Sequence, residues 1–153
     1  MRRMGKSTLE FDRPPSILSH AAVGGKKEAE GPLGDQFDQT FGDTTLQADS
    51  WEKAEAQLQK EAVSIALEKA GLGPEGVDFI LAGDLLNQCI SSTFGLMDFQ
   101  IPFLGQYGAC STMAQTLLMA SILVESGAAG KALAVTSSHF CSAERQFRLP
   151  LEY

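Results

Sequence analysis

The stretch from residue 102 to residue 139, PFLGQYGACSTMAQTLLMASILVESGAAGKALAVTSSH, decides the fold. It opens with FLGQY at 103–107, a weak strand pattern bracketed by glycines. CSTMAQTLLMASILVESG at 110–127 then places apolar residues at helical spacing and ends on a glycine. KALAVTSS at 131–138 indicates a second strand. Strand, helix and strand in this order predict a unit of a mainly parallel α/β sheet.

A helix, a buried strand and a second helix precede this unit. Apolar residues recur at helical spacing from Trp51 to Lys69, with Ser50 placed to cap that helix and Gly71 placed to stop it. VDFILAG at 77–83 is short, β-branched and aromatic, which favours a buried parallel strand. A second helix is expected from Ser91 to about Phe99. The alternation of helix and strand therefore extends over most of the chain.

The composition of the chain changes near residue 48. Residues 1–48 carry turn signals at short spacing, among them Pro14-Pro15 and Gly24-Gly25, so we expect a loop-rich arm with short strands. Residues 49–153 predict an α/β domain with a mostly parallel sheet and a buried helix. A length of 153 residues with 44% hydrophobic residues is sufficient for one globular domain with a core.

Charge and cysteine content exclude several function classes. The net charge of −7 argues against a nucleic-acid partner, because phosphate binding needs a basic face. Three cysteines without a C-x-x-C pair favour neither a disulfide scaffold nor a zinc site. The spacing of Asp35, Asp38 and Asp43 does not match an EF-hand calcium loop. We therefore expect no metal and no cofactor.

Cys110 can be interpreted in two ways. At the start of a helix, its sulfur would lie beside unpaired N–H groups and the positive end of the helix dipole, which favour a thiolate. Gly108 and Ala109 would allow a sharp turn that lifts the thiol out of the core. The alternative is a small buried residue, the usual state of a free cysteine. A nucleophile also needs a base, and neither His20 nor His139 is placed convincingly for that role.

The helix that follows Cys110 is unusually apolar. Its main apolar stripe is predicted to be buried, so we expect most sides of this helix to be covered; the stripe consists of Met113, Leu117, Ala120 and Val124.

The chain resembles the amino-terminal half of the thiolase-like superfamily, which includes the condensing enzymes of fatty-acid synthesis. Within that superfamily it is similar to the stage V sporulation AD family. The segments that carry this similarity are EGPLGDQFDQTF (30–41), SWEKAE (50–55), AGDLLNQ (82–88), GACST (108–112) and SSHFCSAERQFRLPLEY (137–153). The resemblance extends over nearly the whole chain from about Leu9.

The resemblance implies a thiolase-like layered fold and a function in sporulation. In the superfamily the active cysteine lies where Cys110 lies, while the catalytic His and Asn or second Cys belong to a second half that this sequence, ending at Tyr153, does not contain. We therefore expect the chain to be truncated, to lack catalysis and to expose a large apolar face. The implied function is binding of dipicolinic acid, alone or as its calcium chelate, for uptake into the forespore. The alternative is an acyltransferase that uses Cys110 as its nucleophile.

The same resemblance implies where the protein works and with which partners. The expected partners are other stage V sporulation membrane proteins and, for the full-length protein, a second copy in a homodimer. The expected location is the cytoplasmic face of the forespore inner membrane, as a peripheral protein.

Five residues are candidate ligand contacts for dipicolinate: Cys110, His139, Arg145, Arg148 and Asn87. Arginine suits the ligand because its planar guanidinium matches a carboxylate. Less specific roles are open for each of these residues.

The arginines can instead pair with Glu144 and Glu152, and His139 can be satisfied by a backbone carbonyl. Asp84, Asn87 and Gln88 can serve only to bond loop backbone groups. The tail from Ala143 to Tyr153 can be a loop that faces a partner.

Overall fold

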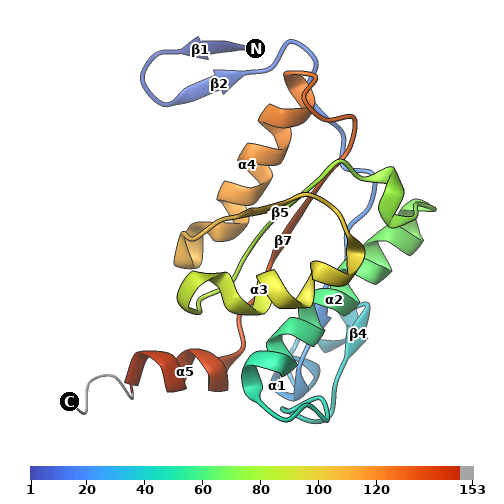
Figure 1. The fold of residues 1–153 in the computed structure, drawn as a ribbon, viewed down its shortest axis with the longest axis vertical. Coiled ribbons are helices and arrows are strands. Elements are labelled where there is room, and N and C mark those ends of the chain that lie inside the picture. The colour runs from blue at the N-terminus through green and yellow to red at the C-terminus, as the bar shows by residue number, and fades with distance from the viewer. Residues whose placement is uncertain (149–153) are drawn as a thin grey trace.

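A parallel three-stranded sheet forms the centre of the protein (Figure 1). The computed structural model describes residues 1–148. The sheet has the order β6-β5-β7, with β5 (Phe79–Gly83) between β6 (Phe103–Gly105) and β7 (Ala132–Thr136). Both neighbours are parallel to β5. The three strands predicted from the sequence are therefore confirmed, together with their parallel arrangement.

Helices cover both faces of this sheet, which makes three layers (Figure 1). Helix α4 (Thr112–Glu125) packs against β5 and β7 on one face. On the other face lie α2 (Trp51–Ala70) and α3 (Ile90–Gly95), which pack against each other. Because both faces are covered, β5 is buried along nearly its whole length, as a central parallel strand requires.

Helix α2 has the two ends that the sequence predicts. The Ser50 hydroxyl accepts a hydrogen bond of 3.3 Å from the backbone N–H of Lys53, which satisfies one of the unpaired donors at the helix start. Gly71 closes the helix in the left-handed conformation, with φ of 64°, and its N–H donates to the Glu68 carbonyl. Local sequence alone therefore sets both boundaries of this helix.

The main hydrophobic core joins α2 and the segment after α3 to the sheet. It consists of Val63, Leu67, Val77, Ile80, Ala82, Leu96, Ile101 and Val135. Burial of such side chains contributes about 1.5–3 kcal/mol each. The core therefore fixes the position of α2 relative to the carboxyl ends of the strands.

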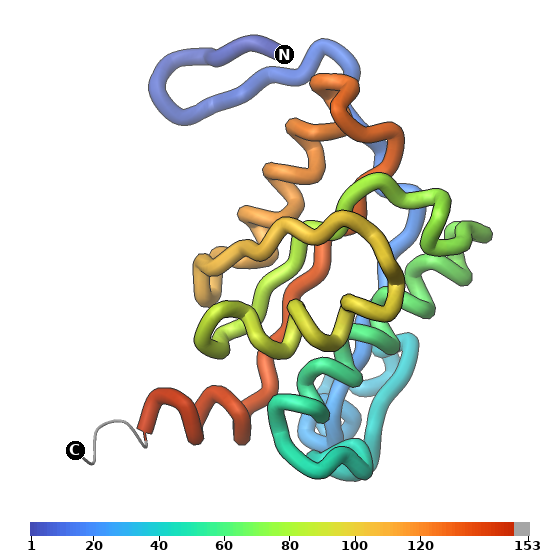
Figure 2. The backbone as a smooth tube through the Cα atoms, in the orientation of Figure 1, coloured from blue at the N-terminus to red at the C-terminus, as the bar shows by residue number. Residues whose placement is uncertain are grey.

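The amino terminus forms an exposed hairpin that projects from the end of α4 (Figure 2). Its strands are β1 (Arg2–Met4) and β2 (Thr8–Glu10), which pair in antiparallel orientation. The hairpin is tied to α4 because the backbone N–H of Asp12 donates to Glu125, at 2.9 Å.

Residues 13–48 precede α2 in the chain. They first lie against α2 and then form a small second sheet. This sheet contains only β3 (Val23–Gly24) and β4 (Gln39–Thr40), beside the short helix α1 (Lys26–Ala29). The Ser19 hydroxyl donates to the Ala66 carbonyl at 2.7 Å. The amino-terminal segment is thus attached directly to α2.

The predicted helix from Ser91 to about Phe99 is divided in the structure. Helix α3 ends at Gly95, and Met97–Phe99 form a separate 3-10 helix. A side chain at position 95 would clash with α2, since a Cβ there would lie 2.8 Å from the Ala56 carbonyl oxygen. Close packing against α2 explains why a glycine ends this helix.

Helix α5 (Phe140–Arg148) follows β7 and was not predicted. The sequence interpretation of the tail as a loop is wrong for residues 143–148, which are helical. Glu152 and Tyr153, which also belong to that interpretation, lie outside the described residues. A helix of this length is marginal in isolation, so its contacts with α2 are needed to stabilise it.

Helix α4 is buried on one side only, which corrects the prediction for its main stripe. Its buried residues are Thr112, Thr116 and Ala120, which face the sheet. Met113 and Leu117 belong to the predicted stripe but are 61% and 42% exposed. In residues 1–148 the sheet is the main layer packed against this helix, so its opposite side remains open, in line with the expected exposed apolar face.

None of the helices in residues 1–148 combines the length and the apolar composition that crossing a bilayer requires.

Candidate functional site

The carboxyl ends of the three parallel strands form the candidate site. β5, β6 and β7 end at Gly83, Gly105 and Thr136, and the loops that follow them emerge at the same edge of the sheet (Figure 1). Open α/β sheets bind their ligands at this edge. Three of the predicted contact residues, Asn87, Cys110 and His139, come from these three loops.

Close contact between two backbone segments shapes the first part of this edge. A Cβ atom on Gly83 would lie 1.9 Å from the carbonyl oxygen of Gln106 and 2.8 Å from Thr112 Cγ2. Only glycine fits here, because any side chain would push the strand away from the turn that follows β6.

The turn between β6 and α4 is sharp, as predicted. The N–H of Gly108 donates to Thr112 Oγ1 at 3.1 Å, and the Ser111 hydroxyl donates to the Gly108 carbonyl at 2.7 Å. Ala109 has φ of 47°, in the left-handed region that L-residues seldom occupy. The turn is thus fixed by its own side chains and by an unusual backbone conformation.

Cys110 lies in this turn with its side chain exposed. It belongs to the 3-10 helix Ala109–Ser111 and precedes Ser111, the N-cap of α4, so it lies just outside the first turn where the sequence placed it. The alternative prediction, in which Cys110 is a small buried residue, is therefore wrong.

Cys89 is the buried thiol on the neighbouring loop. Its sulfur donates a hydrogen bond to the Gln106 carbonyl at 3.3 Å, which links the loop after β5 to the turn before α4. Burial raises the pKa of this thiol, which opposes thiolate formation. Cys110 is therefore the more accessible of these two thiols.

Asp84 holds the loop after β5 rather than facing solvent. Its carboxylate is buried and accepts hydrogen bonds from Leu86 N and from the N–H and hydroxyl of Ser92, at 2.5–2.8 Å. The predicted role of bonding loop backbone groups is confirmed for Asp84. Asn87 and Gln88 are exposed beside it.

His139 is buried and bound to a carbonyl. Its Nε2 lies 2.7 Å from the carbonyl oxygen of Thr44, so this nitrogen carries the hydrogen and donates. The carbonyl partner expected from the sequence is confirmed, while contact with a ligand stays a prediction. The other ring nitrogen, Nδ1, is buried without a protein partner in residues 1–148.

Arg145 and Arg148 line an apolar groove between the start of α2 and α5. The groove has a volume of about 420 Å³ and is lined by Trp51, Phe140, Cys141, Glu144, Arg145 and Arg148. Arg145 forms an ion pair with Glu52, and Arg148 pairs with Glu144 one turn earlier. The pairing of Arg148 with Glu144 was anticipated from the sequence. A ligand carboxylate would have to compete with these side chains.

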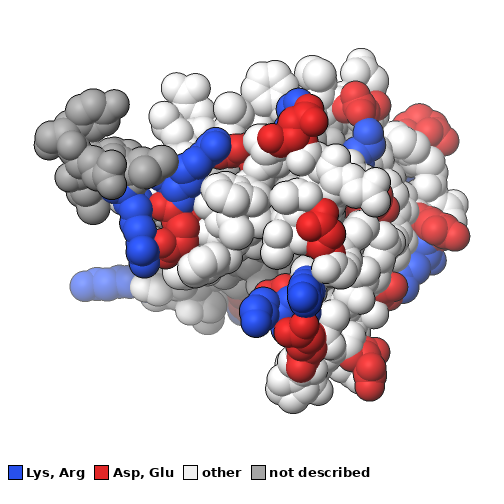
Figure 3. Space-filling model, turned by 90° about the horizontal axis from the view of Figure 1, so that it is seen from below, with Lys and Arg blue, Asp and Glu red and all other residues white. Residues whose placement is uncertain are grey.

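Charge is mixed over the end of the molecule that Figure 3 shows. Lysine and arginine side chains lie among aspartate and glutamate side chains, and uncharged surface separates the groups. A broad single-sign field that would attract a large polyanion is not visible on this face.

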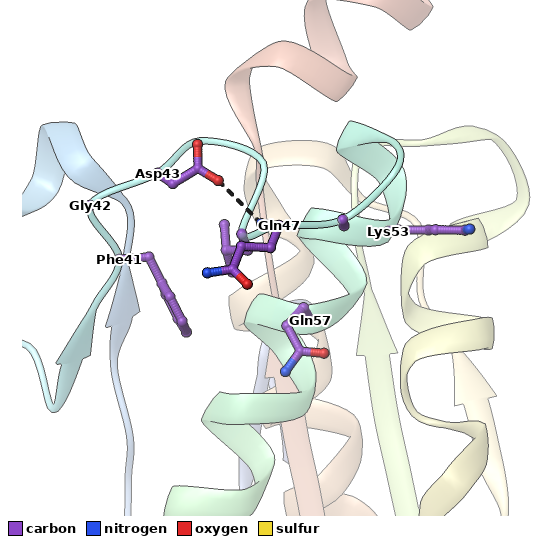
Figure 4. A pocket seen from close by; sticks show the side chains of 8 residues that line it. Phe41, Gly42, Asp43, Gln47, Lys53 and Gln57 are labelled. Carbon is purple, nitrogen blue, oxygen red and sulfur yellow. Dashed lines mark hydrogen bonds between the residues drawn. The ribbon is translucent and has the colours of Figure 1, made fainter.

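A second, larger pocket was not predicted (Figure 4). It has a volume of about 580 Å³ and is lined by Phe41, Gly42, Asp43, Leu46, Gln47, Ala48, Lys53 and Gln57. Its loop is held by Asp43, which accepts hydrogen bonds from the Thr45 hydroxyl at 2.6 Å and the Gln47 N–H at 3.1 Å. These bonds lower the pKa of Asp43. The pocket lies between the loop at residues 41–48 and the first turns of α2, which follows that loop directly in the chain.

Neither pocket is lined by Cys110, His139 or Asn87. In the part of the chain from residue 1 to residue 148, no cluster of three His, Cys, Asp or Glu side chains could hold a metal ion.

A buried polar network that includes two α2 side chains was not predicted either. Glu55 and Gln59 are 0% and 1% exposed although they lie on a helix that the sequence describes by its apolar residues. Their spacing continues the core positions Val63 and Ala66, which is the signal that could have revealed their burial.

The fold described above indicates the class of protein to which the chain belongs. A parallel sheet between helical layers is an α/β fold, and comparison with a solved structure identifies this fold as thiolase-like. A similar solved structure is the 3-oxoacyl-(acyl-carrier-protein) synthase III from Aquifex aeolicus VF5. The TM-score is 0.52 and the identity 23%, over 58% of this chain and 31% of the synthase. At this identity the similarity defines the fold alone.

The sequence comparison then defines the family. Residues 5–153 match the family Stage V sporulation protein AD (SpoVAD). The chain therefore belongs to this sporulation family. A relative from Bacillus subtilis (strain 168), named Stage V sporulation protein AD, is 46% identical over 153 residues. The match covers 100% of this chain and 45% of the relative, so the chain spans less than half of that protein.

Proposed function

We propose that this chain forms part of a non-catalytic dipicolinate-binding protein, a component of the machinery that takes up calcium dipicolinate into the forespore. The observation that carries the proposal is membership of the sporulation family together with the groove that Trp51, Phe140 and Arg145 line. In residues 1–148, no hydrogen bond joins Cys110 to a histidine, and His139 donates to a backbone carbonyl. We therefore favour ligand binding over acyl transfer.

The chemistry of the groove supports an aromatic dicarboxylate. Trp51 and Phe140 offer ring surfaces for a planar aromatic ligand, and Arg145 offers a guanidinium that can bind a carboxylate in two-point fashion. Because Arg145 now pairs with Glu52, the ligand must displace that carboxylate. Binding would thus exchange one partly exposed ion pair for another.

Calorimetric titration of the full-length protein with dipicolinate tests the proposal. We expect heat of binding, and Arg145→Ala should weaken binding by about 10- to 100-fold, since a charge-assisted hydrogen bond contributes roughly 1.5–3 kcal/mol. Arg2→Ala is the matched control, because Arg2 is also an exposed arginine paired with a glutamate, but on the distant hairpin. Absence of heat, or equal loss in both variants, contradicts the proposal.

A second candidate function is acyl transfer at Cys110. The exposed thiol in the turn before α4 and the fold shared with a synthase favour it. In this reaction the Cys110 thiolate would attack an acyl-CoA carbonyl, forming a thioester and releasing the CoA thiol. Incubation with acyl-CoA and peptide mapping should then find the acyl group on Cys110 and none in Cys110→Ser. If no thioester forms at any pH, this function is excluded.

We further propose that the protein is peripheral on the cytoplasmic face of the forespore inner membrane, beside other stage V sporulation membrane proteins, and that the full-length protein is a homodimer.

A third function is a scaffold for these membrane proteins that binds no ligand. One variant distinguishes this scaffold from a dipicolinate-binding protein. If Arg145→Ala abolishes dipicolinate binding but still recovers the membrane partners in a pull-down, ligand binding and assembly are separate activities. If the protein recovers partners but never binds dipicolinate, the scaffold alone remains.

A further inference from the structure

The thiol of Cys89 is a buried group that neither candidate function uses. Cys89 is 6% exposed and lies in the segment that connects β5 to α3. Its sulfur donates to the Gln106 carbonyl oxygen at 3.3 Å, and Gln106 lies in the segment that connects β6 to α4. One side chain therefore joins two of the three loops at the carboxyl edge of the sheet.

The Gln106 carbonyl stands where the ladder between β5 and β6 would continue. The Gln106 N–H donates to the Ala82 carbonyl at 2.8 Å. In a parallel pair, a residue that donates to one residue of its neighbour accepts from the residue two positions further on, which here is Asp84. The part of the chain from residue 1 to residue 148 contains no such backbone bond. The donor to this carbonyl is the Cys89 thiol instead.

The surroundings of the sulfur agree with this replacement. Gly83 lets the Gln106 carbonyl approach closely, since a Cβ atom at position 83 would lie 1.9 Å from its oxygen. Burial is the main cause that raises the pKa of the Cys89 thiol, and a hydrogen bond from the Asp84 backbone opposes this rise. The thiol thus lies between the donor and the acceptor that would otherwise form the next bond of the ladder.

The loop that carries the thiol has an unfavourable backbone. Gln88 and Cys89 have φ of 56° and 50°, in the left-handed region that L-residues seldom occupy. Such residues persist only where neighbouring contacts hold them. The Cys89 N–H donates to the Leu86 carbonyl at 3.1 Å, and the Cys89 carbonyl accepts from the Thr93 hydroxyl at 2.8 Å. Both backbone groups are bonded nearby in the chain, so the thiol is the group of Cys89 that binds the neighbouring loop.

The turn that presents Cys110 begins at the same carbonyl. The turn is attached to the sheet at its start through the Gln106 peptide group, and at its end Thr112 packs at the Gly83 position. Between these points its bonds are internal, as the bond from the Gly108 N–H to Thr112 Oγ1 shows. The position of the start of this turn therefore depends on the two bonds that Gln106 makes.

We propose that Cys89 is a positioning residue, whose thiol hydrogen bond holds the turn that presents Cys110 against the loop that carries Asn87. This role assigns no reaction to Cys89 itself. Its consequence for chemistry at Cys110 rests on the second candidate function, acyl transfer, but the position of the turn does not. Without the thiol, the Gln106 carbonyl has no hydrogen-bond donor within residues 1–148, and the start of the turn is free to move.

Hydrogen–deuterium exchange of the full-length protein tests the proposal with two variants. Cys89→Ala removes the donor, so the protection of the Gly108 and Ser111 amides in the turn should fall by about two- to tenfold, the factor expected for one hydrogen bond. Cys89→Asn should restore protection, because its side-chain NH₂ can donate to Gln106 and asparagine tolerates the left-handed conformation. Cys141→Ala is the matched control, since it removes a thiol from α5.

Three results of the exchange measurement overturn the proposal. The first is unchanged protection of the turn in Cys89→Ala, and the second is an equal loss in Cys141→Ala. The third is a loss of the same factor throughout α2, which would mean that the whole fold is weakened rather than the turn. Neither dipicolinate nor acyl-CoA is used, so failure of either candidate function leaves this test unaffected.

Infrared spectroscopy keeps the proposal testable if Cys89→Ala does not fold. The difference spectrum between the wild type and Cys89→Asn isolates the S–H stretching band of Cys89. A thiol that donates a hydrogen bond absorbs at lower frequency than a free thiol, so the band should lie below that of the same protein unfolded in urea. A band at the same or higher frequency shows that the thiol does not donate, and the proposal is then wrong.

Discussion

At the scale of single residues, one glycine determines how closely two loops of the candidate site approach. Gly83 ends β5 against the backbone that follows β6, where a Cβ atom would lie 1.9 Å from Gln106 O. The turn that presents Cys110 depends on this contact, because Thr112 of the same turn also touches the Gly83 position. Accessibility of the cysteine is therefore a consequence of packing several residues away.

Gly83→Ala should destabilise the protein by about 1–3 kcal/mol, the usual cost of forcing extra atoms into a packed site. The backbone carbonyl that it meets cannot move aside as a flexible side chain could. Urea denaturation of the full-length protein measures the change. Gly42→Ala is the control, since nothing lies within 4 Å of its Cβ position and its φ is not positive. Equal stability of the two variants would contradict the close approach.

At the scale of elements, α2 organises the molecule. It is the longest of the described helices, it packs against α3 and α5, and it supplies Glu55 and Gln59 to the buried network. Its amino end also contributes Trp51 to the groove. A change in the stability of this helix should therefore affect the core and the candidate site together.

Ser50→Ala should reduce the free energy of unfolding by about 1 kcal/mol, because the Lys53 N–H loses the side-chain oxygen that caps it. Thermal or urea denaturation checks this value. Ser64→Ala serves as the control within the same helix, since its exposed hydroxyl bonds only to the Lys60 carbonyl and alanine favours the helix. A loss as large at position 64 as at position 50 would show that the cap has no special effect.

At the scale of the whole molecule, an open apolar helix face is the dominant surface feature. α4 contacts the sheet through Thr112, Thr116 and Ala120, while Met113, Leu117 and Leu118 are exposed on the same helix. Contiguous apolar surface of this kind promotes association with another apolar surface. Within residues 1–148, this face of α4 is therefore available for contact with another apolar surface.

The chain of 153 residues studied on its own should self-associate through this face. Leu118→Lys should shift the distribution towards monomer, because a charge on the open face is costly to bury. Sedimentation velocity at several concentrations measures the shift. Ser64→Lys adds the same charge to the exposed side of α2 and should leave association nearly unchanged. If both variants behave alike, association occurs elsewhere.

Much of the fold is determined by local sequence. The periodicity from Trp51 to Lys69, the cap at Ser50 and the stop at Gly71 predict α2 almost to the residue. The strand at 79–83 and the turn at Gly108-Ala109 also follow from short patterns. These features depend on hydrogen bonds and backbone conformations within a few residues of one another, which a sequence pattern can express.

The site was decided by tertiary contacts. No local pattern shows that Arg145 pairs with Glu52 or that residues 140–148 form a helix, because each depends on a partner far away in the chain. The sequence alone established the family resemblance, the parallel α/β architecture and the turn at Cys110 as a candidate site. Which polar groups are removed from water is set by the packing of α2 against α3, α5 and the sheet, since burial is a property of the assembled layers.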